Sequence, residues 1–309
     1  MAIFFAMPGN ERLGADLARL AAGTLGSIEV RSFPDGETYV RVLTDVKQRD
    51  VFIVCTLARP DGQFLALSFA AAALRDLGAS RVQLIAPYLA YMRQDRIFHE
   101  GEALTSRLFA QLVQQHFDGL ITIDPHLHRH VSIDEVYDIP SLSAHVGPLF
   151  AAWIAGNVRD PLVIGPDEES GQWVEAIARE VGAPWSVMHK ERRGDRDVAM
   201  RAPDLDRYRD CQPVIIDDIL SSGTSLRRAI GLVCRQGLSL PYCLIVHALC
   251  SARTARSIKQ RSAGLLTTNS VPNPDALFDV SSMIADIVQS APPFRGSSNG
   301  VIRRAPRNF

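Results

Sequence analysis

The sequence has few cysteines and no excess of charge of either sign. Its five cysteines are an odd number among 309 residues and show no CxxC spacing, so nothing indicates a disulfide framework. We expect reduced, buried thiols in a cytoplasmic protein. Lys and Arg total 33 against 34 Asp and Glu, a formal charge of −1, so no overall field draws the chain to nucleic acid or anionic lipid. We therefore expect a small-molecule ligand and no nucleic-acid partner.

Long hydrophobic runs are also absent. The first ten residues, MAIFFAMPGN, have no basic segment, and their apolar run is far too short for a signal peptide. The longest apolar helical stretch, FLALSFAAAAL at 64–74, is too short to span a bilayer. We expect neither export nor a membrane partner.

The chain does contain a regular alternation of short apolar runs with amphipathic stretches of helical period. The apolar runs, which suit buried strands, lie at residues 2–6, 51–57, 81–88, 120–124, 161–167, 185–189, 213–218, 242–250 and 265–271. This order predicts an α/β fold with mainly parallel sheets and helices on both faces. Ligands of such sheets collect beyond the carboxyl ends of the strands, so residues at those ends are the first candidates for function.

The order of the elements indicates two α/β domains of similar construction. The alternation restarts after residues 138–150, which predicts an N-terminal domain at 1–145 and a C-terminal domain at 146–290. A chain of 309 residues is long enough for two domains of ordinary size. Residues 291–309 are rich in Pro, Gly, Ser and Arg, and we expect an extended or disordered tail there.

The stretch VIIDDILSSGTSLRR at 214–228 has the pattern of a strand, a small-residue loop and a helix. Its β-branched start suits a buried strand, and helical period begins at Ser225. The amino end of a helix has unpaired N–H groups and a positive dipole, which suit a phosphate, and a glycine lets the backbone approach it closely. The candidate phosphate-binding residues are Ser221, Ser222, Gly223, Thr224 and Ser225.

Asp217 and Asp218 lie at the end of the strand-like run, shortly before this loop. Carboxylates repel phosphate, so these two should face another part of the same ligand, either vicinal hydroxyls that donate to them or a bridging divalent cation. A sugar phosphate offers hydroxyls at one end and phosphate at the other. The alternative is a plain connection in which a serine caps the helix and the aspartates lie in a turn.

Two further strand ends carry candidate ligands. After the run LITI, Asp124 precedes His126, His128 and His130, which suit a metal or a nucleotide phosphate but also a solvated surface loop. In the stretch VIGPDEESGQW, Asp167 can hold a cation or cap a helix.

Three further polar stretches are informative. Two of them allow either a functional or a surface role, and the third predicts only a hairpin turn. The loop YLAYMRQDRIFHEGEALTSR at 88–107 is either a mobile lid or plain surface. The basic run HKERRGDRD at 189–197 is either a solvated face or a set of cations that stabilise a polyphosphate transition state. The stretch SFPDGETYVRV at 32–42 predicts a hairpin around the turn PDG.

Together, these motifs resemble the ribose-phosphate pyrophosphokinase family. The resemblance covers the chain to about residue 290 and runs through FPDGE at 33–37, YMRQDR at 91–96, DPH at 124–126, PD at 166–167, HKERR at 189–193 and VIIDDILSSGTS at 214–225. It implies two tandem type I phosphoribosyltransferase-like domains. It also implies transfer of the pyrophosphoryl group of ATP to the C1 hydroxyl of ribose 5-phosphate, with Mg²⁺ as cofactor, in a homo-oligomer such as a dimer or hexamer.

The resemblance implies roles for residues on the nucleotide side. The adenine ring would contact three residues of a neighbouring subunit, namely Phe33, Asp35 and Glu37. The rest of ATP would contact Arg93, Gln94, Asp95 and His126. Magnesium would be held by His126 and Asp167.

The resemblance likewise implies catalytic and sugar-binding residues. The catalytic cations would be Lys190, Arg192 and Arg93. Ribose 5-phosphate would be held through its hydroxyls and phosphate by Asp217, Asp218, Ser221, Ser222, Gly223, Thr224 and Ser225. Two rival functions stay open: a non-catalytic homologue that regulates an active synthetase, and a phosphoribosyltransferase.

The chain departs from the commonest family pattern in two loops. After PD, Glu168 and Glu169 replace the usual paired glycines, which indicates either an additional cation or a differently oriented loop. In the ribose-phosphate loop, Ser221 stands where many members have a third acid and Thr224 where many have a second glycine. These differences leave open pyrophosphate binding, allosteric regulation and oligomer size.

Overall fold

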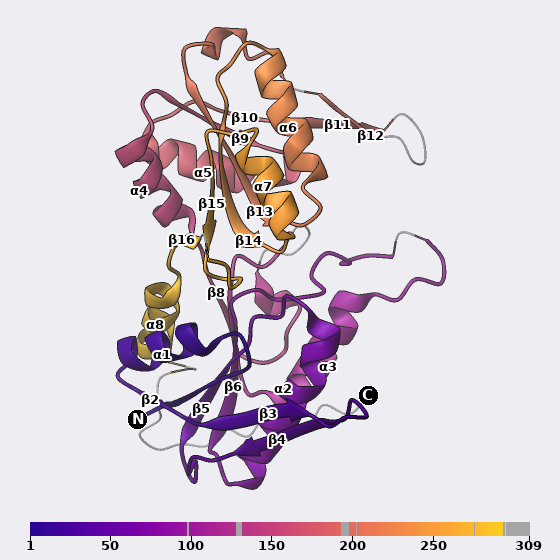
Figure 1. The fold of residues 1–309 in the computed structure, drawn as a ribbon, viewed down its shortest axis with the longest axis vertical. Coiled ribbons are helices and arrows are strands. Elements are labelled where there is room, and N and C mark those ends of the chain that lie inside the picture. The colour runs from indigo at the N-terminus through magenta and orange to yellow at the C-terminus, as the bar shows by residue number, and fades with distance from the viewer. Residues whose placement is uncertain are drawn as a thin grey trace.

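The chain folds into two stacked α/β lobes, each built around its own sheet (Figure 1). The computed structural model describes residues 1–97, 99–127, 132–192, 198–201, 203–274, 276–292 and 294, with the backbone alone at 190–192 and 198–201. In the view of Figure 1 the first lobe lies below and the second above, and the carboxyl ends of several strands face the seam between them.

The first sheet has six parallel strands. In spatial order they are β2 (Thr24–Leu25), β1 (Ile3–Ala6), β5 (Asp50–Val54), β6 (Arg81–Ala86), β7 (Leu120–Ile123) and β8 (Ser141–Ala144). Side chains alternate between the two faces, so Phe5 and Ile53 pack under α2 (Pro60–Asp76) and α3 (Thr105–His116). Phe4 and Phe52 point the other way, towards α1 (Glu11–Leu20).

The second sheet repeats this arrangement with six parallel strands. They are β10 (Trp185–Val187), β9 (Pro161–Gly165), β13 (Gln212–Leu220), β14 (Tyr242–Ala248), β15 (Gly264–Thr268) and β16 (Ala276–Phe278). One face packs against α6 (Thr224–Arg235) and α7 (Ala252–Lys259), and the other against α4 (Gly147–Asn157) and α5 (Gly171–Val181). The prediction of an α/β fold with two mainly parallel, helix-flanked sheets is confirmed.

Two antiparallel hairpins stand apart from the sheets. One joins β3 (Ile28–Ser32) to β4 (Thr38–Val42), as the PDG turn predicted. The other joins β11 (His189–Arg192) to β12 (Val198–Arg201) and projects from the second lobe (Figure 1). Three short 3₁₀ helices cover Ile133–Glu135, Glu168–Ser170 and Asp206–Tyr208.

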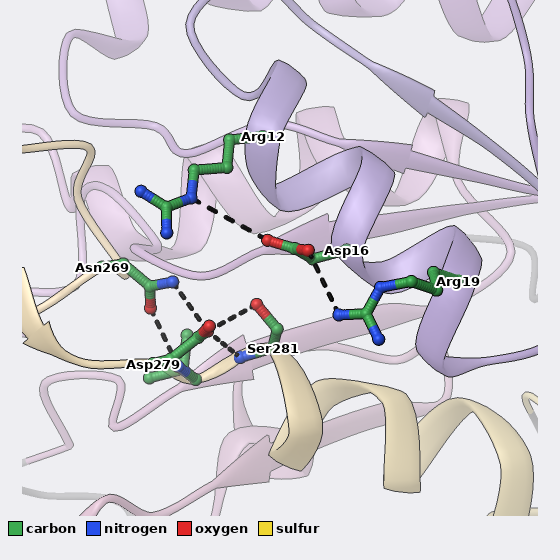
Figure 2. Close-up of polar contacts among 7 residues, drawn as sticks. Arg12, Asp16, Arg19, Asn269, Asp279 and Ser281 are labelled. Atoms are coloured by element: carbon green, nitrogen blue, oxygen red, sulfur yellow. Dashed lines mark hydrogen bonds and ion pairs between the residues drawn. The ribbon is translucent and has the colours of Figure 1, made fainter.

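The last helix, α8 (Ser281–Ser290), crosses back to the first lobe. It packs beside α1 and against β7 and β8, and the Gln289 amide donates to the Leu20 carbonyl at 2.9 Å. Figure 2 shows its start, where the Asp279 carboxylate accepts hydrogen bonds from Asn269 and from the backbone N–H and hydroxyl of Ser281. The helix α8 therefore ties the two lobes together.

One hydrophobic core runs through both lobes. Phe4 and Phe52 stack at 5.1 Å between ring centroids, and they share a cluster with Val214 and Leu244 of the second sheet. Phe294, in the segment expected to be an extended or disordered tail, is 1% exposed and belongs to the same cluster. Because interiors are close-packed, a continuous core limits how far one lobe can move against the other.

All five cysteines are free thiols. Cys55 and Cys243 are buried, and burial raises the pKa of each thiol, to about 12 for Cys55. Among the residues that the structure describes, no helix combines the length and apolar character needed to cross a membrane.

Candidate active site

The predicted strand–loop–helix is present at the carboxyl end of β13. Residues 221–223 form the loop, and α6 begins at Thr224, one residue earlier than its period predicted. Gly223 precedes the helix with a φ of +74°, and a Cβ there would lie 2.8 Å from Cγ2 of Thr254. A glycine is therefore required both by the backbone conformation and by the space available.

The loop presents hydroxyl groups to solvent beside a basic side chain. Ser221, Ser222, Thr224 and Ser225 are exposed. Arg227 folds back over the loop, with Nη2 donating to the Ser222 carbonyl at 3.1 Å and lying 3.4 Å from the Thr224 hydroxyl. Sequence reasoning missed Arg227, although its position on the first turn of α6 is a signal for it. A guanidinium beside a helix amino end increases the fit to an anion.

The two carboxylates lie within β13, and residues 219–220 separate them from the loop. Burial raises the pKa of Asp217, and the negative charges of Asp218 and Asp167 raise it further. Burial also opposes ionisation of Asp218, but its hydrogen bonds with His126 and Asp217 and the charges of nearby histidines together outweigh burial and lower its pKa. Asp218 therefore stays ionised, whereas Asp217 is stabilised by a proton, a hydroxyl donor or a cation.

His126 reaches this pair from the other lobe. It follows β7 of the first sheet, and its Nδ1 lies 2.5 Å from Oδ2 of Asp218. The DPH segment and the DD pair, 92 residues apart in sequence, thus meet at the seam between the lobes. His128 and His130 lie outside the described residues.

Asp124, the first residue of the DPH segment, holds the turn that leads to His126. It has a φ of +33°, which is unusual for a non-glycine residue. Its carboxylate accepts from the Val146 N–H at 2.8 Å and lies 2.7 Å from Nδ1 of His145. The hydrogen bond and charge of Asp124 raise the pKa of His145 in spite of its partial burial. The carboxylate therefore orders the turn, and its carbonyl faces the second lobe.

The candidate lid begins close to the same seam. Gln94 is tied to the start of α3, since its side-chain oxygen accepts from the Thr105 hydroxyl at 3.1 Å and its carbonyl from the Ser106 N–H at 3.3 Å. Arg93 is exposed and Asp95 is half-buried.

Burial raises the pKa of Tyr88, the positive charge of Arg93 lowers it, and the negative charge of Asp218 raises it. The phenol of Tyr88 is thus influenced by a charge from each lobe.

The PD turn is oriented by its own hydrogen bonds. Asp167 accepts from the Ser170 N–H at 3.1 Å and caps the 3₁₀ helix, while the Ser170 hydroxyl donates to the Asp167 carbonyl at 2.6 Å. Oε1 of Glu168 lies 2.9 Å from Nδ1 of His189, the residue before Lys190. This acid therefore contacts the base of the β11–β12 hairpin.

The basic pair lies on β11. Lys190 is opposite Met200 and Arg192 opposite Val198 in the antiparallel ladder. Only the backbone of these residues is described, and Arg193 and Arg196 lie outside the described residues.

The FPDGE tip forms a separate exposed turn. The Phe33 N–H donates to the Glu37 carbonyl at 2.8 Å, and the Asp35 carboxylate accepts from the Glu37 N–H at 3.2 Å. Phe33 is 41% exposed, with Tyr39 edge-on at 5.9 Å and the Arg31 guanidinium 4.8 Å from its ring. The hairpin lies on the side of the first lobe away from β13 (Figure 1).

The side chains at the seam fit a magnesium ion whose ligands come partly from the protein and partly from a bound substrate. Among the described residues no three His, Cys, Asp or Glu side chains form a metal cage of their own. Mg²⁺ is usually held by one or two carboxylates together with water and substrate phosphates. Asp167 and Asp217 are oxygen donors whose mutual repulsion raises the pKa of Asp217, so a divalent cation would relieve it.

The chain has two α/β units, each with a parallel sheet, and a carboxylate pair and a hydroxyl-rich loop lie at the end of one sheet. These features define a phosphoribosyltransferase-like protein. Residues 2–116 match the N-terminal domain of ribose phosphate pyrophosphokinase, and residues 132–280 match the phosphoribosyl transferase domain. The chain belongs to the ribose-phosphate pyrophosphokinase family, as its motifs predicted.

Individual relatives agree with this assignment. The ribose-phosphate pyrophosphokinase of Sulfolobus acidocaldarius is 30% identical, over 87% of this chain and 94% of its own. That of Methanopyrus kandleri is 30% identical, over 93% of this chain and 99% of its own. The phosphoribosylpyrophosphate synthetase of Mycobacterium smegmatis has the same fold, with a TM-score of 0.83 at 21% identity over 93% of this chain and 97% of that chain.

Proposed function

We propose that this chain transfers the pyrophosphoryl group of Mg-ATP to the C1 hydroxyl of ribose 5-phosphate, giving phosphoribosyl pyrophosphate and AMP. The observation that carries the proposal is the 2.5 Å contact between His126 of the first lobe and Asp218 of the second. This contact joins the DPH segment to the DD pair, and it supports a site in which the nucleotide and the sugar phosphate lie side by side. Family membership supports the same reaction.

Ribose 5-phosphate binds at the end of β13 in this proposal. The N–H groups and hydroxyls of residues 221–225 hold its phosphate, assisted by Arg227, whose guanidinium lies over the loop. Asp217 and Asp218 accept hydrogen bonds from the ribose hydroxyls. The two carboxylates thus hold the end of the sugar that is remote from the phosphate loop.

ATP binds on the side of the first lobe. Arg93, Gln94, Asp95 and His126 contact its phosphates and ribose, and Asp167 and His126 hold the magnesium ion. When bound, that ion offsets negative charge on the phosphate oxygens. The adenine ring lies against Phe33, Asp35 and Glu37 of a neighbouring copy, because the exposed hairpin points away from its own β13. A homo-oligomer follows from this arrangement.

The reaction requires alignment and charge compensation more than covalent help from the protein. The C1 hydroxyl oxygen attacks the β-phosphorus in line and gives up its proton, the bond from the β-phosphorus to the α-β bridging oxygen breaks, and AMP leaves with that oxygen. Lys190, Arg192 and Arg93 offset the charge that builds on the phosphate oxygens. The lid of residues 88–107 excludes water as it closes. The free thiols agree with a reducing, cytoplasmic setting for this enzyme.

Phosphorus NMR of the protein with Mg-ATP and ribose 5-phosphate tests the proposal. We expect AMP and a new pyrophosphoryl sugar to appear in equal amounts. No AMP, with both ligands shown to bind by calorimetry, would favour the regulatory homologue. A phosphoribosyltransferase would also release no AMP from ATP, but it would consume phosphoribosyl pyrophosphate and a base. A second set of spectra with those two substrates therefore separates it from the regulatory homologue.

A further inference from the structure

A buried histidine crosses the seam between the two lobes. His247, near the end of β14, is 1% exposed. Its Nε2 lies 3.2 Å from the carbonyl oxygen of Asp124 in the first lobe, and its Nδ1 lies 2.8 Å from the hydroxyl oxygen of Ser270. The ring of Tyr88 packs on it at 5.0 Å between centroids. No motif drew attention to this residue.

The partners determine which ring nitrogen carries the proton. A carbonyl oxygen only accepts, so Nε2 of His247 donates to Asp124. In a neutral ring Nδ1 is then an acceptor, and the Ser270 hydroxyl, which also lies 3.0 Å from the Val246 carbonyl, can donate to it. Burial lowers the pKa of His247, which agrees with a neutral ring. The Thr268 hydroxyl accepts from the Ser270 N–H at 3.0 Å and fixes that residue in turn.

A second hydrogen bond fastens Ser270 to the first lobe. Its carbonyl accepts from the Thr56 hydroxyl at 2.9 Å, and the Thr56 N–H donates to the side-chain oxygen of Asn10 at 2.9 Å. All three residues are at most 3% exposed. Buried polar networks of this kind specify one geometry, because any displacement leaves groups unpaired in a medium that cannot replace water.

The bond from His247 acts on the turn that carries His126. Asp124 has a positive φ, and its carboxylate is already occupied by His145 and the Val146 N–H. Its carbonyl accepts the hydrogen bond from Nε2–H of His247 in the second lobe. Two residues later, His126 meets Asp218.

We propose that His247 is a positioning residue, whose Nε2–H holds the Asp124 carbonyl so that the nucleotide-side and sugar-side halves of the site keep their mutual placement. The inference rests on the proposed function for its effect on turnover. Each substrate contacts mainly one lobe, so loss of the bond should lower kcat while each KM changes little. A small error of alignment is enough, since about 1 Å can cost roughly a hundredfold in rate.

Two amide variants test this in the full-length protein. In His247→Gln the amide nitrogen can replace Nε2 and still donate to the Asp124 carbonyl. In His247→Asn the shorter side chain reaches only the position of Nδ1, where its amide oxygen can accept from Ser270, and the bond to Asp124 is lost. We expect kcat of His247→Asn to fall roughly a hundredfold, with both KM values within about threefold of wild type, and His247→Gln to lose less than about tenfold. Ser262→Ala is the control, because it removes a buried hydroxyl bonded to Ile258 within the second lobe alone, and it should keep kcat.

Amide hydrogen exchange supplies a readout without turnover. The Asp124 N–H is bonded to the Ala144 carbonyl, and its exchange should be faster in His247→Asn than in His247→Gln. If His247→Asn does not fold, Ser270→Ala, which removes the hydroxyl that donates to Nδ1, should show the same effects at about tenfold in kcat.

Wild-type kcat in His247→Asn, equal losses in both amide variants, or unchanged exchange at Asp124 would overturn the inference. If the wild-type protein releases no AMP from Mg-ATP and ribose 5-phosphate, the proposed function fails instead. The exchange comparison then still decides whether His247 holds the turn.

Discussion

Gly223 joins β13 to α6 with a φ of +74°, and a Cβ on it would meet Thr254 at 2.8 Å. Gly223→Ala should lower the free energy of unfolding by about 1–3 kcal/mol, the usual cost of a strained backbone position. It should also weaken ribose 5-phosphate binding, because the loop must shift. Denaturant unfolding and calorimetric titration with ribose 5-phosphate measure the two effects.

Gly156→Ala is the matched control for this change. Gly156 lies in α4, and a Cβ there meets nothing within 4 Å. Alanine should raise stability by about 0.5–1 kcal/mol through its helix preference and leave ligand binding unchanged. If Gly223→Ala binds and unfolds like wild type, the close approach at the loop has no role.

Lys190 on β11 is the cation with the largest expected effect on rate. Lys190→Ala should reduce AMP release by roughly a hundredfold or more, because the charge that builds on the phosphate oxygens loses a partner. Ribose 5-phosphate should still bind, since its proposed site lies on β13 and α6. Lys47→Ala, an exposed lysine of the first lobe, is the control. Turnover retained by Lys190→Ala would remove that residue from the catalytic set.

At the scale of elements, the start of α8 depends on one carboxylate. Asp279 accepts from the Ser281 N–H at 2.8 Å, the Ser281 hydroxyl at 2.5 Å and the Asn269 amide at 2.8 Å (Figure 2). Burial opposes its ionisation, but these hydrogen bonds outweigh burial and lower its pKa. A lowered folded-state pKa contributes stability above the unfolded value and loses it as the pH falls through the folded value.

Asp279→Asn should therefore cost stability in a pH-dependent way. We expect a loss of about 1 kcal/mol in unfolding free energy at pH 7, kept small by solvent screening. The difference from wild type should shrink as the pH falls below about 3.9, where the ordinary carboxyl group protonates. Denaturant titrations across this range measure it. Asp286→Asn, on the exposed face of α8, should show no such trend; an equal trend there would argue against a specific cap.

At the scale of the whole molecule, the proposed site is shared between copies. The double variant Phe33→Ala, Asp35→Ala cannot supply adenine contacts to the site of a neighbouring copy. The variant Lys190→Ala lacks the catalytic cation of its own site. Mixed after dissociation, the two should regain about a quarter of wild-type activity at low ATP, because half of random dimers are mixed and each has one intact site.

The control for this mixing combines Arg93→Ala with Lys190→Ala, since both residues act in their own chain in the proposed site. That mixture should stay inactive. Restored activity there, or none in the first mixture, would contradict a shared site. Sedimentation analysis of each mixture confirms that hetero-oligomers have formed.

Most elements were predictable because their signal is local. Strands such as β5 and β13 are apolar runs, and helices such as α1 have an apolar stripe of helical period. β8 was missed because its four residues, SLSA, offer too little alternation. α4 was missed because its sequence, GPLFAAWIAGN, is apolar around most of its circumference and lacks an amphipathic period.

By itself the sequence determined the α/β class, the family and the candidate residues, because periodicity, turn chemistry and motif spacing are properties of neighbouring residues. Only the tertiary structure decided which candidates meet. The contacts of His126 with Asp218 and of His247 with Asp124 join residues 92 and 123 positions apart, and the bond from Gln289 to Leu20 spans 269. Such contacts depend on how two lobes pack around a common core, and side-chain packing over that distance leaves no local pattern in the chain.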